Sequence, residues 1–313
     1  MTSKKILITG GAGYIGSKLT TKLLILGYKV TVVDNLQYGS DSLNHLFIYN
    51  NFKFINSDIN HLDFSKFFLE EFDFIIPLAA LVGAPLCDKF PKLAIKTNLT
   101  SIKKLVLKLN KNQKIIYPTT NSGYGIGEKN RYCTEETPLN PISLYGRTKA
   151  DAEEVVMNHK NSISFRLATV FGYSYRMRTD LLVNFMTREA VIKKKLLLYE
   201  PNFRRNFIHI NDIVDAFTFA IVNFKNLKGD VYNLGLSSAN ITKLQLATKI
   251  QNVIKELKIV IDKNGKDPDK RDYVVSNKKI ESKGFKAKVK LEEGIKELSK
   301  VFKNSKTKYK NNY

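Results

Sequence analysis

The hydrophobic and polar positions in the first half of the chain follow two alternating patterns. Short apolar runs of strand length, rich in Ile, Val and Phe, stand at 5–10, 29–34, 52–56, 72–80, 114–120 and 163–172. The stretches between them have helical patterns, which predict helices at 14–26, 90–110 and 143–160. Strand and helix alternating at this spacing predict an α/β fold with a doubly wound parallel sheet.

This alternation becomes looser from about Tyr173 onward. Helices are expected near 180–194, 210–226, 242–257 and 291–303, with short strands and loops between them. We interpret this half as a smaller α/β C-terminal domain that binds the substrate, with some segments returning to the first domain. The predicted division is 1–172 with about 207–233 for the first domain, and 173–206 with 234–313 for the second. The end of the chain, KNSKTKYKNNY, is expected to be a frayed tail.

A glycine-rich turn follows the first predicted strand. Gly11, Gly13 and Gly16 fit the pattern G-x-G-x-x-G, and Gly10 stands immediately before it. Glycines let the backbone approach a pyrophosphate at a helix N-terminus, where amide groups and the helix dipole favour negative charge. Because a strand precedes the motif and an amphipathic helix follows it, the motif predicts a dinucleotide-binding, Rossmann-type first domain.

Residues at the ends of the next strands refine this prediction. Asp34 ends the second strand, 18 residues after Gly16. A carboxylate there accepts hydrogen bonds from the adenosine ribose and repels a 2′-phosphate, which favours NAD over NADP. Asp58 ends the third strand and is either an adenine contact or a helix cap. The small residues of PLAAL at 77–81 either leave room for a cofactor or serve tight packing.

A tyrosine and a lysine lie four residues apart in the predicted helix 143–160. This spacing places Tyr145 and Lys149 on one helical face. A phenol with a pKa of about 10 is a poor base at neutral pH. A nearby ammonium and the positive nicotinamide ring both favour the phenolate and lower that pKa. The pair is therefore a candidate for proton abstraction beside a bound dinucleotide.

These residues together carry a resemblance to a known family. TGGAGYIG, Asp34, Thr120 and Tyr145-xxx-Lys149 resemble the extended short-chain dehydrogenases/reductases that act on nucleotide sugars, over essentially the whole chain. The resemblance implies bound NAD and a homodimer formed through helices 90–110 and 145–160. It also implies a triad: Thr120 binds the reacting sugar hydroxyl, Tyr145 is the base, and Lys149 holds the ribose and tunes Tyr145. One departure is Pro77, where the family usually has His.

The same resemblance leads us to assign binding residues. The cofactor set, besides Tyr145 and Lys149, is Gly10, Gly13, Tyr14, Ile15, Gly16, Asp34, Asn35, Asp58, Ile59, Leu78, Ala79, Ala80 and Asn98. The substrate set is Asn121, Ser122, Arg176, Asn184, Arg205 and Arg271. Arginine suits a diphosphate because its guanidinium is a planar fork. A surface salt bridge is the alternative for Arg205 and Arg271, and a solvated loop is the alternative for Arg176 and Arg178.

The two residues after Thr120 narrow the reaction. Dehydratases of the family carry Asp-Glu there, because eliminating water needs an acid and a base, and glucuronate decarboxylases carry Glu at the second position. This chain has Asn121 and Ser122, which do not exchange protons usefully near neutral pH. The sequence therefore disfavours dehydration and decarboxylation, and it leaves oxidation of the sugar C4 hydroxyl.

Two outcomes of that oxidation are left open. PLAALVGAPLC, TNSGYGIGEK, FRLATVF and KDPDKRDY resemble the GDP-D-glycero-D-manno-heptose 4-dehydrogenases of bacterial capsule biosynthesis. This resemblance favours a GDP-sugar, release of the 4-ketone, and reoxidation of tightly bound NADH by 2-oxoglutarate. The alternative is a 4-epimerase acting on a UDP- or GDP-sugar, which turns the keto-sugar over and returns the hydride.

Composition bears on partners and location. The 313 residues carry a net charge of +22, but lysines spread along the whole chain predict a solvated surface, with no nucleic acid as partner. Cys87 and Cys133 have no ligand partners at metal spacing, so we expect no metal site. No apolar run approaches the ~18 residues of a membrane span, and the N-terminal apolar stretch is too short for a signal peptide. We therefore expect a cytoplasmic enzyme without membrane contact.

A non-catalytic NAD-binding scaffold is the alternative class, but it has no use for the Thr120–Tyr145–Lys149 set.

Overall fold

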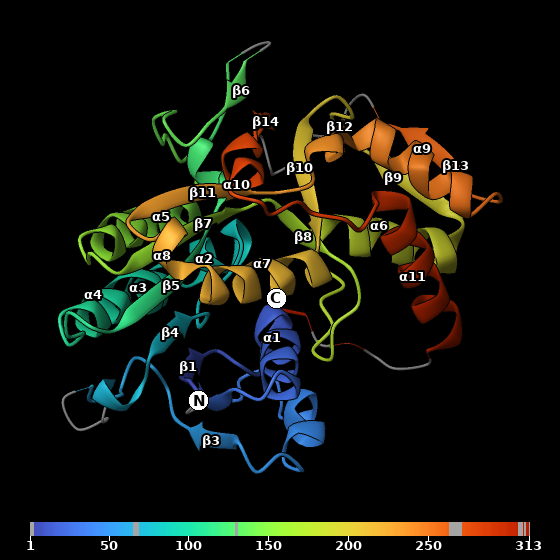
Figure 1. Ribbon diagram of the computed structural model, residues 1–313. Helices are drawn as coiled ribbons and strands as arrows, with labels where there is room; N and C mark the ends of the chain where they lie inside the picture. The colour runs from blue at the N-terminus through green and yellow to red at the C-terminus, as the bar shows by residue number, and fades with distance from the viewer. Residues whose placement is uncertain are drawn as a thin grey trace.

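A parallel seven-stranded sheet forms the centre of the protein (Figure 1). The computed structural model describes residues 3–64, 69–128, 131–262, 271–305, 309, 311 and 312. The strands stand in the order β11 (Asp230–Leu234), β7 (Ser162–Leu167), β5 (Lys114–Thr120), β4 (Phe74–Pro77), β1 (Lys5–Thr9), β2 (Lys29–Asp34) and β3 (Phe52–Asn56). The order reverses between β1 and β4, so a crevice opens at their carboxyl ends, where ligands bind in such sheets. The predicted Rossmann-type fold is confirmed.

Helices cover both faces of this sheet. On one face α1 (Tyr14–Ile25), α7 (Ile210–Val222) and α8 (Phe224–Leu227) pack their apolar sides against the strands. On the other face α4 (Ser101–Val106) and α5 (Leu144–Met157) do the same. The strands are buried on both sides, which explains why their sequences are continuous apolar runs and do not alternate between apolar and polar residues.

The predicted single strand at 163–172 is wrong. The chain forms β7, leaves the central sheet at Ala168, and continues as β8 (Thr169–Phe171) in a second sheet. β8 pairs with β10 (Arg204–His209), whereas the Ala168 amide donates to the Leu234 carbonyl of the central sheet. An apolar run does not reveal this division, because both strands are buried in adjoining cores.

Smaller sheets and helices make up the other lobe (Figure 1). β12 (Asn240–Thr242) completes the sheet of β8 and β10, β9 (Lys195–Leu198) pairs with β13 (Lys258–Ile261), and β6 (Tyr132–Cys133) pairs with β14 (Val274–Val275). The helices are α6 (Leu182–Lys193), α9 (Lys243–Val253) and α11 (Leu291–Asn304), with the short α10 (Lys278–Ser282) beside the central sheet. α6, α9 and α11 share one apolar core that is distinct from those of the central sheet, whereas Ile280 of α10 belongs to a core of the central sheet. The residue boundaries of the two domains stay a prediction.

The segment between β4 and β5 differs from the single helix predicted at 90–110. α2 (Ala84–Lys89) and α3 (Pro91–Ile95) are separate because Pro91 starts a new helix. α3 then continues through a π-helical turn (Lys96–Thr100) into α4. The fourth strand also ends earlier than predicted, at Pro77, and this frees Leu78 to Ala80 to line the crevice. In the described part of the chain, no helix is both long and apolar enough to span a membrane.

Candidate functional site

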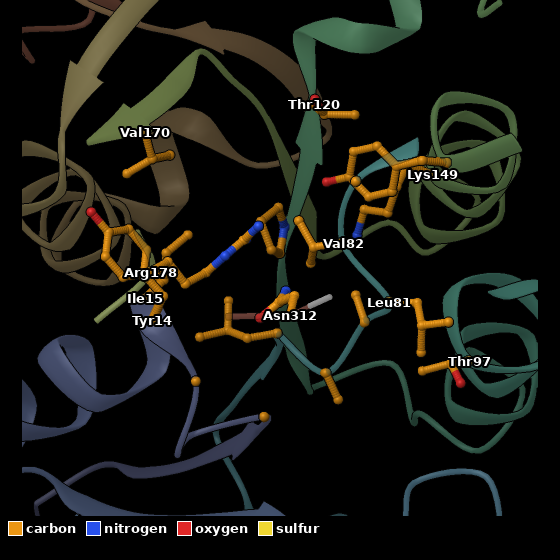
Figure 2. Close-up of a pocket in the computed structure, with 18 of the residues that line it drawn as sticks. Tyr14, Ile15, Leu81, Val82, Thr97, Thr120, Lys149, Val170, Arg178 and Asn312 are labelled. Atoms are coloured by element: carbon orange, nitrogen blue, oxygen red, sulfur yellow. The ribbon is translucent and has the colours of Figure 1, made fainter. Parts of the chain in front are cut away.

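A cleft of about 860 Å³ opens at the carboxyl ends of the central strands (Figure 2). The glycine-rich turn after β1, the segments after β2 to β5, and the start of α5 form one side of it. The segment before α6, together with Arg205 and Arg271 of the second lobe, forms the other side. The cleft therefore joins the predicted cofactor residues to the predicted substrate residues.

The glycine-rich turn is too tight for side chains. A Cβ on Gly16 would lie 2.3 Å from the carbonyl oxygen of Gly10, and Gly10 itself has a φ of +76°. The Gly13 amide donates to the Gly10 carbonyl at 3.1 Å. This close approach directs the N-terminus of α1 toward the cleft, where free amides suit a pyrophosphate. The residues present thus fit a dinucleotide.

Asp34 is fixed at the edge of the cleft by backbone amides. Its Oδ2 accepts from Ala12 N at 2.9 Å and its Oδ1 accepts from Leu36 N at 2.8 Å. Burial raises the Asp34 pKa, and these two hydrogen bonds oppose the rise. Asp58 also lines the cleft and accepts from Asn60 N at 2.8 Å, so it both caps its own turn and faces the cleft.

Thr120, Tyr145 and Lys149 line the cleft together as predicted, with Thr120 at the end of β5 and the other two on α5. Figure 2 labels Thr120 and Lys149. The Thr120 hydroxyl lies near the Tyr145 phenol and is the smallest of the influences that lower the Tyr145 pKa. Burial is the largest influence and raises the pKa of Tyr145 to about 12, while Arg178 and Arg271 lower it. Without ligands the phenol is therefore protonated, and positive charge nearby favours its ionisation.

Lys149 is supported by an aromatic ring. Its Nζ lies 4.0 Å from the centre of the Tyr117 ring, and the residue is only 5% exposed. Burial lowers the pKa of Lys149 to about 7, and the carboxylate of Glu153 opposes this shift. Burial therefore makes the charged form of Lys149 costly in the nucleotide-free protein.

Replacing Lys149 with Met is expected to stabilise the nucleotide-free protein. The folded pKa of about 7 lies below the usual 10.5, so below pH 7 the folded protein bears the full cost of a buried charge. Between pH 7 and pH 10.5 the unfolded chain binds more protons than the folded protein, so the stability of the wild type rises with pH. The stability advantage of Lys149→Met therefore shrinks as the pH rises. Urea unfolding followed by circular dichroism at pH 6.5, 8 and 9.5 measures this. A Met variant less stable than wild type at pH 6.5 contradicts it.

The predicted substrate residues Ser122, Arg205 and Arg271 come together opposite the nucleotide-binding turn. The Ser122 Oγ accepts from Thr120 Oγ1 at 3.0 Å and from Arg271 Nη1. Arg205 in turn donates from Nη1 to the carbonyl of Arg271. The Arg271 guanidinium is therefore linked to the Thr120 hydroxyl through Ser122, and Arg205 bonds the backbone of Arg271. The preceding stretch KDPDK, part of the quoted resemblance, lies outside the described residues.

Three predicted contact residues do not line the cleft. Asn98 is buried and bonds the backbone of Leu81. Asn121 is also buried, so only Ser122 of the two residues after Thr120 faces the cleft. Asn184 is 0% exposed and uses its amide to bond Gly172 N, Tyr14 Oη and Arg178 O. The structure does not support a direct substrate contact by Asn184 and gives it a positioning role for Arg178.

Arg178, for which the sequence left open a nucleotide or sugar contact and a solvated loop, points into the middle of the cleft (Figure 2) and forms a buried ion pair with Asp180. Other cleft residues are absent from the sequence-based assignment. Lys243, at the start of α9, lines the cleft as well. Asn311 accepts from Thr179 N at 3.0 Å, and Asn312 reaches the cleft, so these two residues are not frayed as expected. Nothing in the sequence near these asparagines signals this contact.

Comparison with known proteins agrees with this geometry. Residues 6–235 match the NAD dependent epimerase/dehydratase family. The chain belongs to this family. A UDP-glucose 4-epimerase of Cyamopsis tetragonoloba is 28% identical over 329 residues, covering 94% of this chain and 93% of the relative. A dTDP-D-glucose 4,6-dehydratase of Mus musculus is 28% identical, covering 99% and 91%.

Solved structures of the NAD dependent epimerase/dehydratase family have the same fold. UDP-glucuronic acid 4-epimerase from Bacillus cereus, in complex with UDP-glucuronic acid and NAD, superposes with a TM-score of 0.83. It is 25% identical, and the match covers 96% of this chain and 99% of that one. dTDP-glucose 4,6-dehydratase from Bacillus anthracis, in complex with NAD, has a TM-score of 0.82 at 24% identity, covering 97% and 98%. The protein is thus an NAD-dependent enzyme of the nucleotide-sugar epimerase/dehydratase type, and its cofactor is NAD.

Proposed function

We propose that the protein oxidises the C4 hydroxyl of a nucleoside-diphosphate sugar and carries out no dehydration. The observation that supports this is the environment of Thr120. The Thr120 hydroxyl donates to Ser122 Oγ, which also accepts from Arg271, and it lies near the Tyr145 phenol. A dehydratase needs a carboxylic acid at the position of Ser122 to move a proton. A hydroxyl bound to a guanidinium orients a substrate but does not exchange a proton with it near neutral pH.

The roles of the protein's own groups follow from this arrangement. Thr120 orients the sugar hydroxyl, and Tyr145 takes its proton as a phenolate favoured by Arg178 and Arg271. A bound NAD would supply the hydride acceptor for the sugar carbon. Lys149 and Asp34 bind ribose hydroxyls of the cofactor, and Arg205 with Arg271 binds the sugar diphosphate.

Two end products are proposed for test. The GDP-D-glycero-D-manno-heptose 4-dehydrogenase outcome rests on the sequence resemblance, with the 4-ketone released and 2-oxoglutarate reduced to 2-hydroxyglutarate by the bound NADH. The 4-epimerase outcome is supported by the similarity to UDP-glucose 4-epimerases and to the Bacillus cereus UDP-glucuronic acid 4-epimerase. Both outcomes use the same oxidation and differ only in the fate of the ketone.

The experiment separates these outcomes. The purified protein is denatured to identify the released nucleotide, then fresh protein is given GDP-heptose with and without 2-oxoglutarate, and UDP-glucose or UDP-glucuronic acid alone. A 4-keto product that accumulates only with the oxo acid supports the dehydrogenase. Interconversion of C4 epimers without an added oxidant supports the epimerase. A 4-keto-6-deoxy product from any sugar shows dehydration and contradicts the proposal.

Assembly as a homodimer is also proposed. At α3, Phe90 and Ile95 are exposed, with exposed fractions of 45% and 43%. Covering such side chains with a second copy would remove apolar area from water. Cytoplasmic location and the absence of nucleic-acid partners stay predictions from the sequence.

A further inference from the structure

Arg176 is a buried guanidinium that forms no ion pair with any described residue, although Asp34 and Asp180 act on it through space. The residue is 7% exposed and lines the cleft. Its Nη2 is buried and makes no hydrogen bond with any described residue. Its Cζ lies 4.3 Å from the centre of the Tyr38 ring, so the ring holds the guanidinium in place by a cation–π contact.

The neighbouring carboxylates are already engaged. Asp180 pairs with Arg178 through both of its oxygens. Both oxygens of Asp34 accept backbone amides, and Asp34 forms no ion pair with Arg176. Burial and the charge of Arg178 lower the Arg176 pKa to about 10. A buried guanidinium nitrogen without a hydrogen-bond partner is costly, so the free Nη2 of Arg176 suits an anion that a ligand supplies.

The position of Arg176 indicates which ligand supplies the anion. Tyr38 and Asp34 belong to the end of β2 and the loop after it, and Asp34 is the residue for the adenosine ribose. The diphosphate of the sugar nucleotide has its own pair of guanidinium groups, Arg205 and Arg271, at Ser122. Arg176 therefore lies at the half of the cleft that holds Tyr38 and Asp34, whereas Arg205 and Arg271 lie at the half that holds Ser122.

We propose that Arg176, held by Tyr38, is an anion subsite that binds a phosphate of the NAD pyrophosphate. This revises the sequence-based assignment of Arg176 to the substrate. The subsite adds a side-chain cation to the backbone amides of the glycine-rich turn. The inference concerns cofactor binding alone, so it stands or fails independently of which sugar is oxidised.

Direct binding measurements test the subsite. Calorimetry on nucleotide-stripped protein gives the affinities of NAD, ADP-ribose, UDP and GDP for the wild type and for Arg176→Gln. We expect Arg176→Gln to weaken NAD and ADP-ribose binding roughly 10- to 100-fold, the range for a hydrogen bond to a charged group, and to leave UDP and GDP within about twofold. Arg188→Gln, on the outer side of α6, is the matched control and leaves all four affinities unchanged. Tyr38→Leu is expected to weaken NAD binding, and Tyr38→Phe, which keeps the ring, less so.

A stability measurement distinguishes a ligand-binding Arg176 from a structural one. If Arg176 serves to bind a phosphate, Arg176→Gln leaves the thermal midpoint of the nucleotide-free protein unchanged or raises it. The substitution also reduces the increase in thermal midpoint that NAD produces. A structural arginine would lower the midpoint without ligand. The proposal is overturned if NAD affinity is unchanged, or if UDP and GDP lose more affinity than NAD, which would return Arg176 to the substrate half.

Discussion

Tyr145→Phe is expected to reduce turnover by about 10²- to 10⁴-fold, the usual contribution of a general base. The variant keeps the ring that packs against Leu81, Leu86 and Cys87, and it loses only the hydroxyl that lies near Thr120. NAD should remain bound, because the glycine-rich turn and Asp34 are untouched. Single-turnover formation of NADH, with NAD content measured after denaturation, checks both parts.

A second tyrosine provides the control for this change. Tyr117 lies on β5 directly under Lys149, and its buried hydroxyl has no hydrogen-bond partner among the described residues. Tyr117→Phe keeps the ring that supports the Lys149 ammonium and removes an oxygen that bonds nothing, so turnover should stay within about twofold of wild type. A Tyr145→Phe enzyme that retained most of its rate would show that another group is the base.

Glu153→Gln is expected to lower the free energy of unfolding by roughly 3–5 kcal/mol, the cost of leaving one partner of a buried ion pair uncompensated. Glu153 is 4% exposed and accepts from Arg166 Nη2 at 2.7 Å and from Ser164 Oγ at 2.8 Å. Without the carboxylate, the buried guanidinium of Arg166 keeps its charge in the interior. Urea unfolding followed by circular dichroism measures the loss.

The neighbouring residue and a double variant make this prediction specific. Glu154 is exposed on the same helix, so Glu154→Gln should change the free energy of unfolding by less than about 0.5 kcal/mol. Replacing the pair together, as Glu153→Leu with Arg166→Met, should recover much of the loss, because no unpaired charge is left. A loss below about 1 kcal/mol for Glu153→Gln would mean that water or other polar groups satisfy Arg166.

The ion pair also connects stability to the catalytic helix. Glu153 lies one turn after Lys149 on α5, and its carboxylate raises the Lys149 pKa against the effect of burial. Glu153→Gln should therefore lower that pKa further and reduce the charged fraction of Lys149 at neutral pH. The same substitution tests a packing element and the electrostatics of the site.

Local patterns in the sequence determined much of the fold and of the cofactor site. Gly10, Gly13, Gly16, Asp34, Thr120 and the Tyr145/Lys149 pair line the cleft as predicted, because each acts through its own strand end, turn or helix face. Parallel strands place their carboxyl ends at one edge, so residues at those ends must converge once the order of strands is right. Asn121 and Asn98 fit the sequence pattern too, but their side chains are buried away from the cleft.

The tertiary structure alone decided how the second lobe meets the first. Arg176 lies in the irregular segment before α6, and Asn184 lies in the first turn of α6. No periodicity shows that Asn184 is enclosed behind Arg178 while Arg176 stands beside Tyr38 and Asp34. The pairing of Ser122 with Arg271 joins residues 149 positions apart. Contacts between distant segments depend on how whole elements pack, and packing is a property of the folded chain that local residue patterns do not encode.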